Sequence, residues 1–325
     1  PGTHYYQLKN GDYQLGQFNN QIYTSWMDCY KGINKATIFM KYIYMNEEMN
    51  SEEIADYKAQ ARFARAYLYW TLVRKFGPIP LLGDEEMDQN VPYDELAIPR
   101  SSYEECVEFI ATEMALAAKD LPLKRELRTI GRPTRGAALG MRAKAYLYAA
   151  SPLMNGDQSD YANRLIDHTG KRLLSAEYNE EKWAKAAAAA KDVMELNQYE
   201  LYVANSRSTG DIIYPPTIKP FDDGEFSTKD WPNGYANIDP FESYRSLFNG
   251  ALTADGNPEL MYTHGQNQEG GGIVDMVTHQ LPRYTKGWNC HGTTQKQVDA
   301  YYMVDGSDAP GKDKEIGRGD GSERL

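Results

Sequence analysis

Residues 61–82 read ARFARAYLYWTLVRKFGPIPLL, and this stretch decides how the rest of the chain is interpreted. Its apolar and small residues recur at three- and four-residue spacing, which is typical of a buried helical face. Gly77-Pro78 predicts the end of that helix, because proline cannot continue it. The pentapeptide RAYLY at 65–69 returns as KAYLY at 144–148. We therefore expect a helix that has a second copy later in the chain.

The same periodicity predicts five helices within the first 200 residues. One covers 20–44, and the next is capped by Asn50 with Glu53 and buries a stripe through Ala61, Ala64 and Leu68. A third begins at Ser101 with Glu104 or at Ser102 with Glu105. A fourth runs from its cap at Thr134 to Ala150, and a fifth covers 180–197. The expected core includes Trp26, Trp70, Trp183, Cys29 and Cys106.

The two pentapeptides are 79 residues apart, an offset that fits two helical-hairpin repeats of about 34 residues plus an insertion. The sequence thus predicts a mostly α fold with tetratricopeptide-like hairpins. The alternative is that Ala-Tyr-Leu-Tyr is simply a good buried helix face.

The amino-acid composition changes near residue 200, because 16 of the 27 glycines fall within 200–325. Turn signals and scattered aromatic residues predict a long, irregular, loop-rich segment, which in proteins often carries binding function. We expect a single domain, 1–325. Its parts are a helical-repeat core at 20–199, a loop-rich region at 200–292, and a short helix (293–303) with a polar tail at 293–325.

Composition excludes several functional classes. The formal net charge is -11, from 35 Lys plus Arg against 46 Asp plus Glu, which argues against a nucleic-acid binder. No apolar run is long enough to span a membrane. Three dispersed cysteines and five scattered histidines form no disulfide framework and no zinc motif, and no phosphate-binding or dinucleotide fingerprint is present. We expect no cofactor, no bound metal and no catalysis.

Two sets of carboxylates need a separate interpretation. Asp84/Glu85 and Asp222/Asp223 resemble a glycosidase couple only in composition, because adjacent acids in turns are usually solvated. Asp305, Asp308 and Asp313 lie in a glycine-rich loop, but their spacing does not match a calcium-binding loop. We expect both sets of carboxylates to lie in turns and to be solvated.

The clearest candidate binding residues lie within 283–289, RYTKGWN. A sugar ring has an apolar C–H face that stacks on Trp or Tyr, and its hydroxyls need paired donors and acceptors. Arg283, Tyr284, Trp288 and Asn289 supply that set. Trp231 with Tyr235 forms a second candidate. The alternative for both groups is packing within the loops or contact with a partner.

Residues 61–82 also resemble the signature of the SusD/RagB family, surface nutrient-binding lipoproteins of the Bacteroidetes. The resemblance is carried by Arg65-Ala66, Tyr67, Tyr69, Leu72 and the stop Phe76-Gly77-Pro78-Ile79-Pro80. Five further stretches agree in family order between Trp26 and Gly306, among them 131–149, a strand-like segment at 257–262 and a helix at 294–301. Thr37 departs from the pattern, which usually has Asn there and uses it in a buried hydrogen bond.

The resemblance implies that the chain captures a glycan and passes it to a SusC-like TonB-dependent transporter at the outer membrane, on the cell surface. It implies an N-terminal lipid anchor, and we expect the chain to be an internal piece of a longer precursor that lacks both ends. It also adds His4 and Tyr5 as candidate ligand contacts. The alternatives are a peptide-binding member of the family and a repeat scaffold that binds only protein.

The chain has 25 tyrosines, and their positions separate into two groups. Those in the predicted helices, such as Tyr67, Tyr69 and Tyr148, are expected to pack between hairpins. Those in the loop-rich region, above all Tyr284, are expected to contact ligand.

Overall fold

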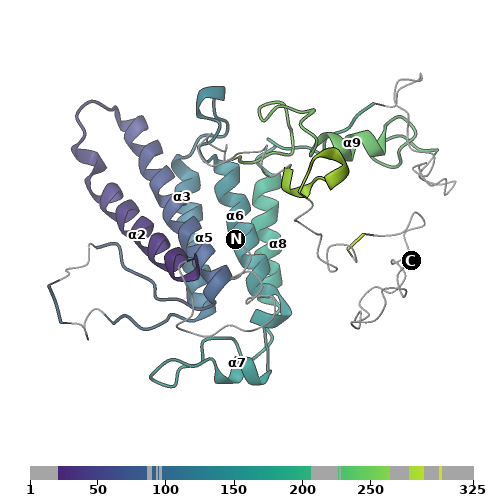
Figure 1. The fold of residues 1–325 in the computed structure, drawn as a ribbon. Helices are drawn as coiled ribbons and strands as arrows, with labels where there is room; N and C mark the ends of the chain where they lie inside the picture. Colours follow the sequence, from purple (N-terminus) through teal and green to yellow (C-terminus); the bar gives the residue numbers. More distant parts are fainter. Residues whose placement is uncertain are drawn as a thin grey trace. The chain divides into compact units, whose positions relative to one another are not determined.

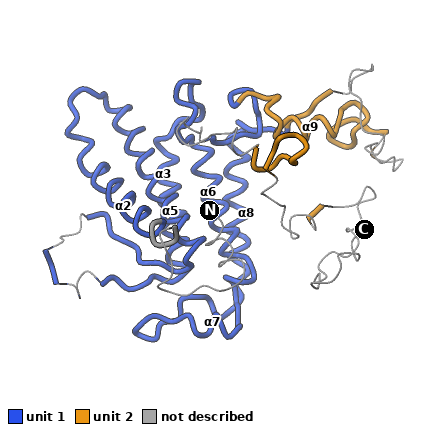
Figure 2. Tube along the Cα trace, in the orientation of Figure 1, with its two compact units in different colours: residues 1–201, 254–263 blue, residues 202–253, 264–325 orange. Residues whose placement is uncertain are grey.

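The computed structural model describes residues 21–85, 90–92, 94, 97–205, 226, 228–263, 278–288 and 300–301. The chain divides into two compact units (Figure 2). The helical unit consists of 1–201 together with 254–263, and the loop unit consists of 202–253 together with 264–325.

The helical unit is a row of helices in which each long helix packs against the next one along the chain (Figure 1). The long helices are α2 (Gln21–Tyr42), α3 (Ser51–Phe76), α5 (Tyr103–Asp120), α6 (Arg135–Ala150) and α8 (Glu181–Met194), with the short α7 (Asp160–Arg164) before α8. In the described part of the chain the only β pairing consists of isolated bridges. The predicted mostly helical fold class is therefore confirmed.

The predicted caps set the helix ends. Asn50 and Glu53 form a capping box at the start of α3, and Ser102 with Glu105, rather than Ser101 with Glu104, forms the one that opens α5. The Thr134 hydroxyl accepts a hydrogen bond from the Ala137 amide at the start of α6. The helix α3 ends at Phe76, directly before Gly77-Pro78.

Side-chain spacing predicted the core correctly for α5. The apolar stripe of α5 is buried throughout, and Ala66 and Ala145, the matched alanines of the two pentapeptides, are both fully buried. Cys29, Cys106 and Trp70 are buried as expected. Trp26 is partly buried and packs against the core.

Two of the predicted faces are wrong. Trp183, assigned to the core, is 41% exposed, because α8 packs mainly against α6 and buries only Ala186, Ala189 and Val193 among its residues. In α3 the predicted stripe is displaced. Ala64 is exposed, and Ala61 and Leu68 are only partly buried. The buried residues of this helix, some of them predicted, are Ala59, Phe63, Arg65, Ala66, Tyr69, Trp70, Leu72 and Val73. This broad face results from packing between α2 on one side and α5 on the other.

A buried ionic network joins three elements of the helical unit around Arg65, which is 1% exposed. Its guanidinium donates to Glu113 on α5 at 3.1 and 2.5 Å and to the Thr37 hydroxyl on α2 at 3.2 Å. Thr37 is thus engaged in a buried hydrogen bond in place of the usual Asn. Arg62 adds a second ion pair to Glu113 at 2.6 Å.

The sequence did not predict α9 (Pro240–Ser246), a short helix of the loop unit that begins at a cap formed by Asp239 with the Glu242 amide. A 3-10 turn, η4 (Arg283–Thr285), follows later. The helix expected at 293–303 lies outside the described residues except for 300–301. None of the helices in the described part of the chain has both the length and the apolarity that a membrane span requires.

Candidate functional site

The candidate residues of 283–289 lie on a loop whose backbone is tightly fixed. The Pro282 carbonyl accepts hydrogen bonds from the Thr285 amide, the Thr285 hydroxyl and the Gly287 amide at 2.9–3.0 Å. The Trp288 amide donates to the Thr278 carbonyl at 2.8 Å. A Cβ built on Gly287 would lie 2.1 Å from the Leu281 carbonyl oxygen, so only glycine fits there.

This fixed loop presents its aromatic side chains to solvent. Tyr284 is 98% exposed and Trp288 is 56% exposed, with Arg283 also exposed beside them. The His279 ring lies 4.7 Å from the Trp288 ring, tilted by 42°. A rigid backbone with exposed aromatic faces is suited to stacking against a flat ligand, because little conformational freedom is lost on binding. His279 was not singled out from the sequence, since no local spacing relates it to Trp288.

The second candidate group lies on another hydrogen-bonded loop of the same unit. Trp231 is 42% exposed, and its amide donates to the Asn237 side chain at 2.9 Å. The Tyr235 amide donates to the Phe226 carbonyl at 2.9 Å, and Tyr235 itself is half-buried. In this group, then, the tryptophan offers a ring face and the tyrosine is mainly a packing residue.

Three predicted site residues, His4, Tyr5 and Asn289, lie outside the described residues. So do the acidic pair Asp222/Asp223 and the aspartates at 305, 308 and 313. In the described ranges no group of three His, Cys, Asp or Glu side chains is placed to hold a metal ion.

The acidic pair Asp84/Glu85 is described, and its partners argue against a glycosidase couple. Asp84 is 77% exposed and forms an ion pair with Arg65 at 2.7 Å. Glu85 forms an ion pair with Lys41 at 3.0 Å. Both carboxylates therefore neutralise cations of the helical unit.

The helical unit contains a large cavity that the sequence did not predict, with a volume of about 820 Å³. Its walls come from α3, α6, α8, Tyr199 and the segment 254–263, which we call the strap. We call this cavity the tyrosine groove, after its aromatic and sulfur-bearing lining of Phe63, Tyr67, Met141, Tyr199, Met261 and Tyr262. Its residues are dispersed between positions 63 and 262, so no local motif marks them.

The strap is held against the start of α6. The Thr134 hydroxyl donates to the Met261 carbonyl at 3.0 Å, and the Glu200 amide donates to the Pro258 carbonyl at 3.3 Å. The expectation of a strand-like segment at 257–262 is wrong. The Asn257 side chain accepts from the Glu259 amide at 3.0 Å and so forms a turn in the strap.

Gly136 on α6 permits this packing. A Cβ built at that position would lie 2.0 Å from the Tyr199 hydroxyl and 2.6 Å from its ring carbons. Tyr199 therefore crosses α6 at a point where any side chain larger than hydrogen would displace it.

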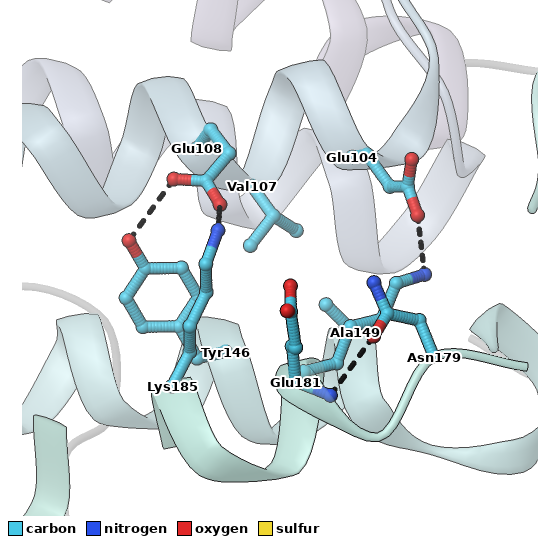
Figure 3. Close-up of a pocket in the computed structure, with 9 residues that line it drawn as sticks. Glu104, Val107, Glu108, Tyr146, Ala149, Asn179, Glu181 and Lys185 are labelled. Atoms are coloured by element: carbon cyan, nitrogen blue, oxygen red, sulfur yellow. Dashed lines mark hydrogen bonds and ion pairs between the residues drawn. The ribbon is translucent and has the colours of Figure 1, made fainter. Parts of the chain in front are cut away.

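A smaller pocket of about 210 Å³ lies between α5, α6 and α8 (Figure 3). Four of its charged side chains already pair with one another. Lys182 forms an ion pair with Glu104 at 2.5 Å, and Lys185 pairs with Glu108, to which the Tyr146 hydroxyl donates at 3.1 Å. The hydrogen bond from Lys185 to Glu108 raises the pKa of Lys185. We interpret this pocket as a structural contact, in which these ion pairs join α8 to α5.

Comparison with known proteins agrees with this architecture. Residues 3–147 match the family model SusD-like_3, which is described as starch-binding and associating with the outer membrane. The chain is also 26% identical over 174 residues to a SusD-like protein of Bacteroides ovatus. These matches show that the chain is similar to SusD/RagB-family proteins.

Solved structures of SusD-like proteins share the fold. The structure of BT4246 is 23% identical and superposes with a TM-score of 0.63 over 90% of this chain. A SusD-like protein from Bacteroides fragilis is 22% identical, with a TM-score of 0.57 over 88%. The chain spans 49% and 42% of those two structures, and it covers 30% of the Bacteroides ovatus relative.

Proposed function

We propose that this SusD-like chain is part of a cell-surface protein that captures a glycan and delivers it to a SusC-like TonB-dependent transporter in the outer membrane. One observation carries the proposal beyond the family description. The loop at 278–288 is fixed by its own hydrogen bonds, yet it leaves Tyr284 and Trp288 exposed. Two exposed aromatic rings on one fixed loop offer a preformed surface on which a ligand can stack.

The chemistry of the loop suits a sugar. The faces of Trp288 and Tyr284 offer apolar, electron-rich surfaces to the C–H face of a pyranose ring. The Arg283 guanidinium, exposed beside them, supplies several hydrogen-bond donors for ring hydroxyls. Affinity from a few stacks and hydrogen bonds lies in the micromolar range, which allows capture and subsequent release to a transporter.

The remaining parts of the proposal follow from the family. Its description as outer-membrane-associated supports a location at the outer membrane. We propose in addition that the protein is exposed at the cell surface and held there by an N-terminal lipid anchor. In that setting the protein binds its ligand and leaves it chemically unchanged. The ion pairs made by Asp84 and Glu85 are consistent with this role, because they engage one of the two acid pairs considered as a glycosidase couple.

The test is to screen the purified protein against a glycan array and a peptide library under the same conditions. We expect binding to a subset of glycans, with soluble starch included because of the family description. Binding to peptides alone would reject the glycan proposal and favour the peptide-binding alternative. Release of shortened sugars from any bound glycan would show instead that the protein is an enzyme.

A further inference from the structure

Three aromatic rings of the tyrosine groove, those of Phe63, Tyr67 and Tyr262, pack against one another. The ring of Phe63 is stacked on Tyr67, with centroids 6.2 Å apart and an interplanar angle of 15°. The same Phe63 ring meets Tyr262 of the strap edge-on at 5.8 Å. Tyr67 is nevertheless 40% exposed, which corrects the expectation that it packs between hairpins.

The hydroxyl groups in the groove differ from those of the core. The core tyrosines Tyr30 and Tyr69 hydrogen-bond through their hydroxyls to Pro80 at 2.7 Å and to Leu82 at 3.0 Å. By contrast, the hydroxyls of Tyr67, Tyr199 and Tyr262 make no hydrogen bond within the described part of the chain. Solvent reaches these three hydroxyls, so they are open to a hydrogen-bonding partner such as a ligand hydroxyl.

The charges at the groove favour a neutral ligand. Its lining includes one basic side chain, Lys144, and one acidic side chain, Glu259, so the formal charge of the lining is balanced. A volume of about 820 Å³ lies within the range of roughly 300–1,000 Å³ that small-ligand sites occupy. Aromatic faces together with unpaired hydroxyls match a ligand with apolar C–H faces and many hydroxyls.

We infer that the tyrosine groove is a second glycan-binding site, which takes a neutral oligosaccharide on the helical unit itself. The inference rests on the proposed glycan-binding function and extends it to residues outside the loop at 278–288. Tyr67 and Tyr262 provide the stacking surface, while the hydroxyls of Tyr67, Tyr199 and Tyr262 and the ammonium of Lys144 bind sugar hydroxyls. Two sites on one chain increase retention of a polymeric ligand that reaches both.

The test uses calorimetry with maltoheptaose, cellohexaose, xylohexaose and mannohexaose, followed by the best of these against variants. The double variant Tyr67→Phe, Tyr262→Phe removes two hydroxyls and keeps both rings against Phe63, so the fold is preserved. We expect its affinity to fall about 5- to 10-fold, as the loss of two hydrogen bonds implies. The larger change Tyr67→Ala should weaken binding further, while Tyr44→Phe, an exposed tyrosine outside the groove, should have no effect.

The outcomes separate this inference from the proposed function. Unchanged affinity in the groove variants, with weaker binding by Trp288→Ala, would overturn the groove and retain glycan capture by the loop. A wild-type protein that binds none of the four oligosaccharides would overturn the groove site, and a negative glycan array would reject the proposed function itself. A methionine- and leucine-rich peptide that binds in their place, and weakens with the same tyrosine variants, would show that the groove takes peptides instead.

Discussion

The helical unit and the loop unit use the same residue types in opposite ways. In the helical unit Arg65 is 1% exposed and its donors reach Glu113, Thr37 and Asp84, so this arginine holds helices together. In the loop unit Arg283 is exposed beside exposed aromatic rings. Trp70 is likewise buried against Tyr148, whereas Trp288 is 56% exposed. The difference shows that composition alone does not distinguish residues that stabilise the fold from residues that meet a ligand.

The largest expected effect comes from breaking the buried network. Arg65→Ala leaves the Glu113 carboxylate buried with only Arg62 as its ionic partner, and removing one member of such a pair typically costs about 3–5 kcal/mol. The free energy of unfolding, measured by denaturant titration, should fall by that amount. The matched variant Arg283→Ala in the loop unit should change it by no more than about 0.5 kcal/mol. Equal losses in the two variants would contradict the division of roles.

A smaller effect is expected where Tyr199 meets α6. Gly136→Ala places a Cβ against the Tyr199 ring, and such overpacking typically costs about 1–3 kcal/mol. Adding Tyr199→Ala removes the obstructing ring, so the double variant should recover part of the stability lost through Gly136→Ala. Thermal unfolding of the single and double variants measures this coupling. Simple addition of the two costs would show that Gly136 and Tyr199 do not contact each other.

A further expected effect is a loss of stability at alkaline pH. Burial raises the pKa of Tyr69 and of Tyr103 from 10.0 to about 12. Because a phenol is neutral when protonated, the raised pKa means that its contribution is fully present below pH 10. That contribution is lost as the pH rises from 10 to 12. Denaturant midpoints across this range should fall, and Tyr69→Phe should flatten the decline more than Tyr284→Phe does. An identical pH profile for both variants would contradict the assignment.

Local signals were enough to predict the framework of the helical unit. Capping pairs such as Asn50 with Glu53 and Ser102 with Glu105 are read within four residues, and the stripe on α5 repeats at the helical period. The interpretation of Trp183 was wrong because a helix's own sequence does not state how many neighbours will cover it. The tyrosine groove was missed for a related reason, since Tyr67 and Tyr262 meet the same Phe63 ring across almost 200 residues of chain.

The candidate site was predictable only in part. The residue types of 283–289 indicated a sugar-binding chemistry, but the exposure of Tyr284 and the contact of His279 with Trp288 depend on the folded loop. The convergence of three hydrogen bonds on the Pro282 carbonyl, which fixes that loop, has no signature in the sequence.

The most direct test of the central claim is glycan retention by the double variant Trp288→Ala, Tyr284→Ala in affinity gel electrophoresis. The gels contain a glycan that the array identifies, or soluble starch. The control is Tyr44→Ala, Tyr178→Ala, which removes two exposed tyrosines from the helical unit. We predict that the loop variant loses retention while its far-ultraviolet circular dichroism stays that of the wild type, and that the control keeps both. Unchanged retention by the loop variant would contradict the assignment of ligand binding to this loop.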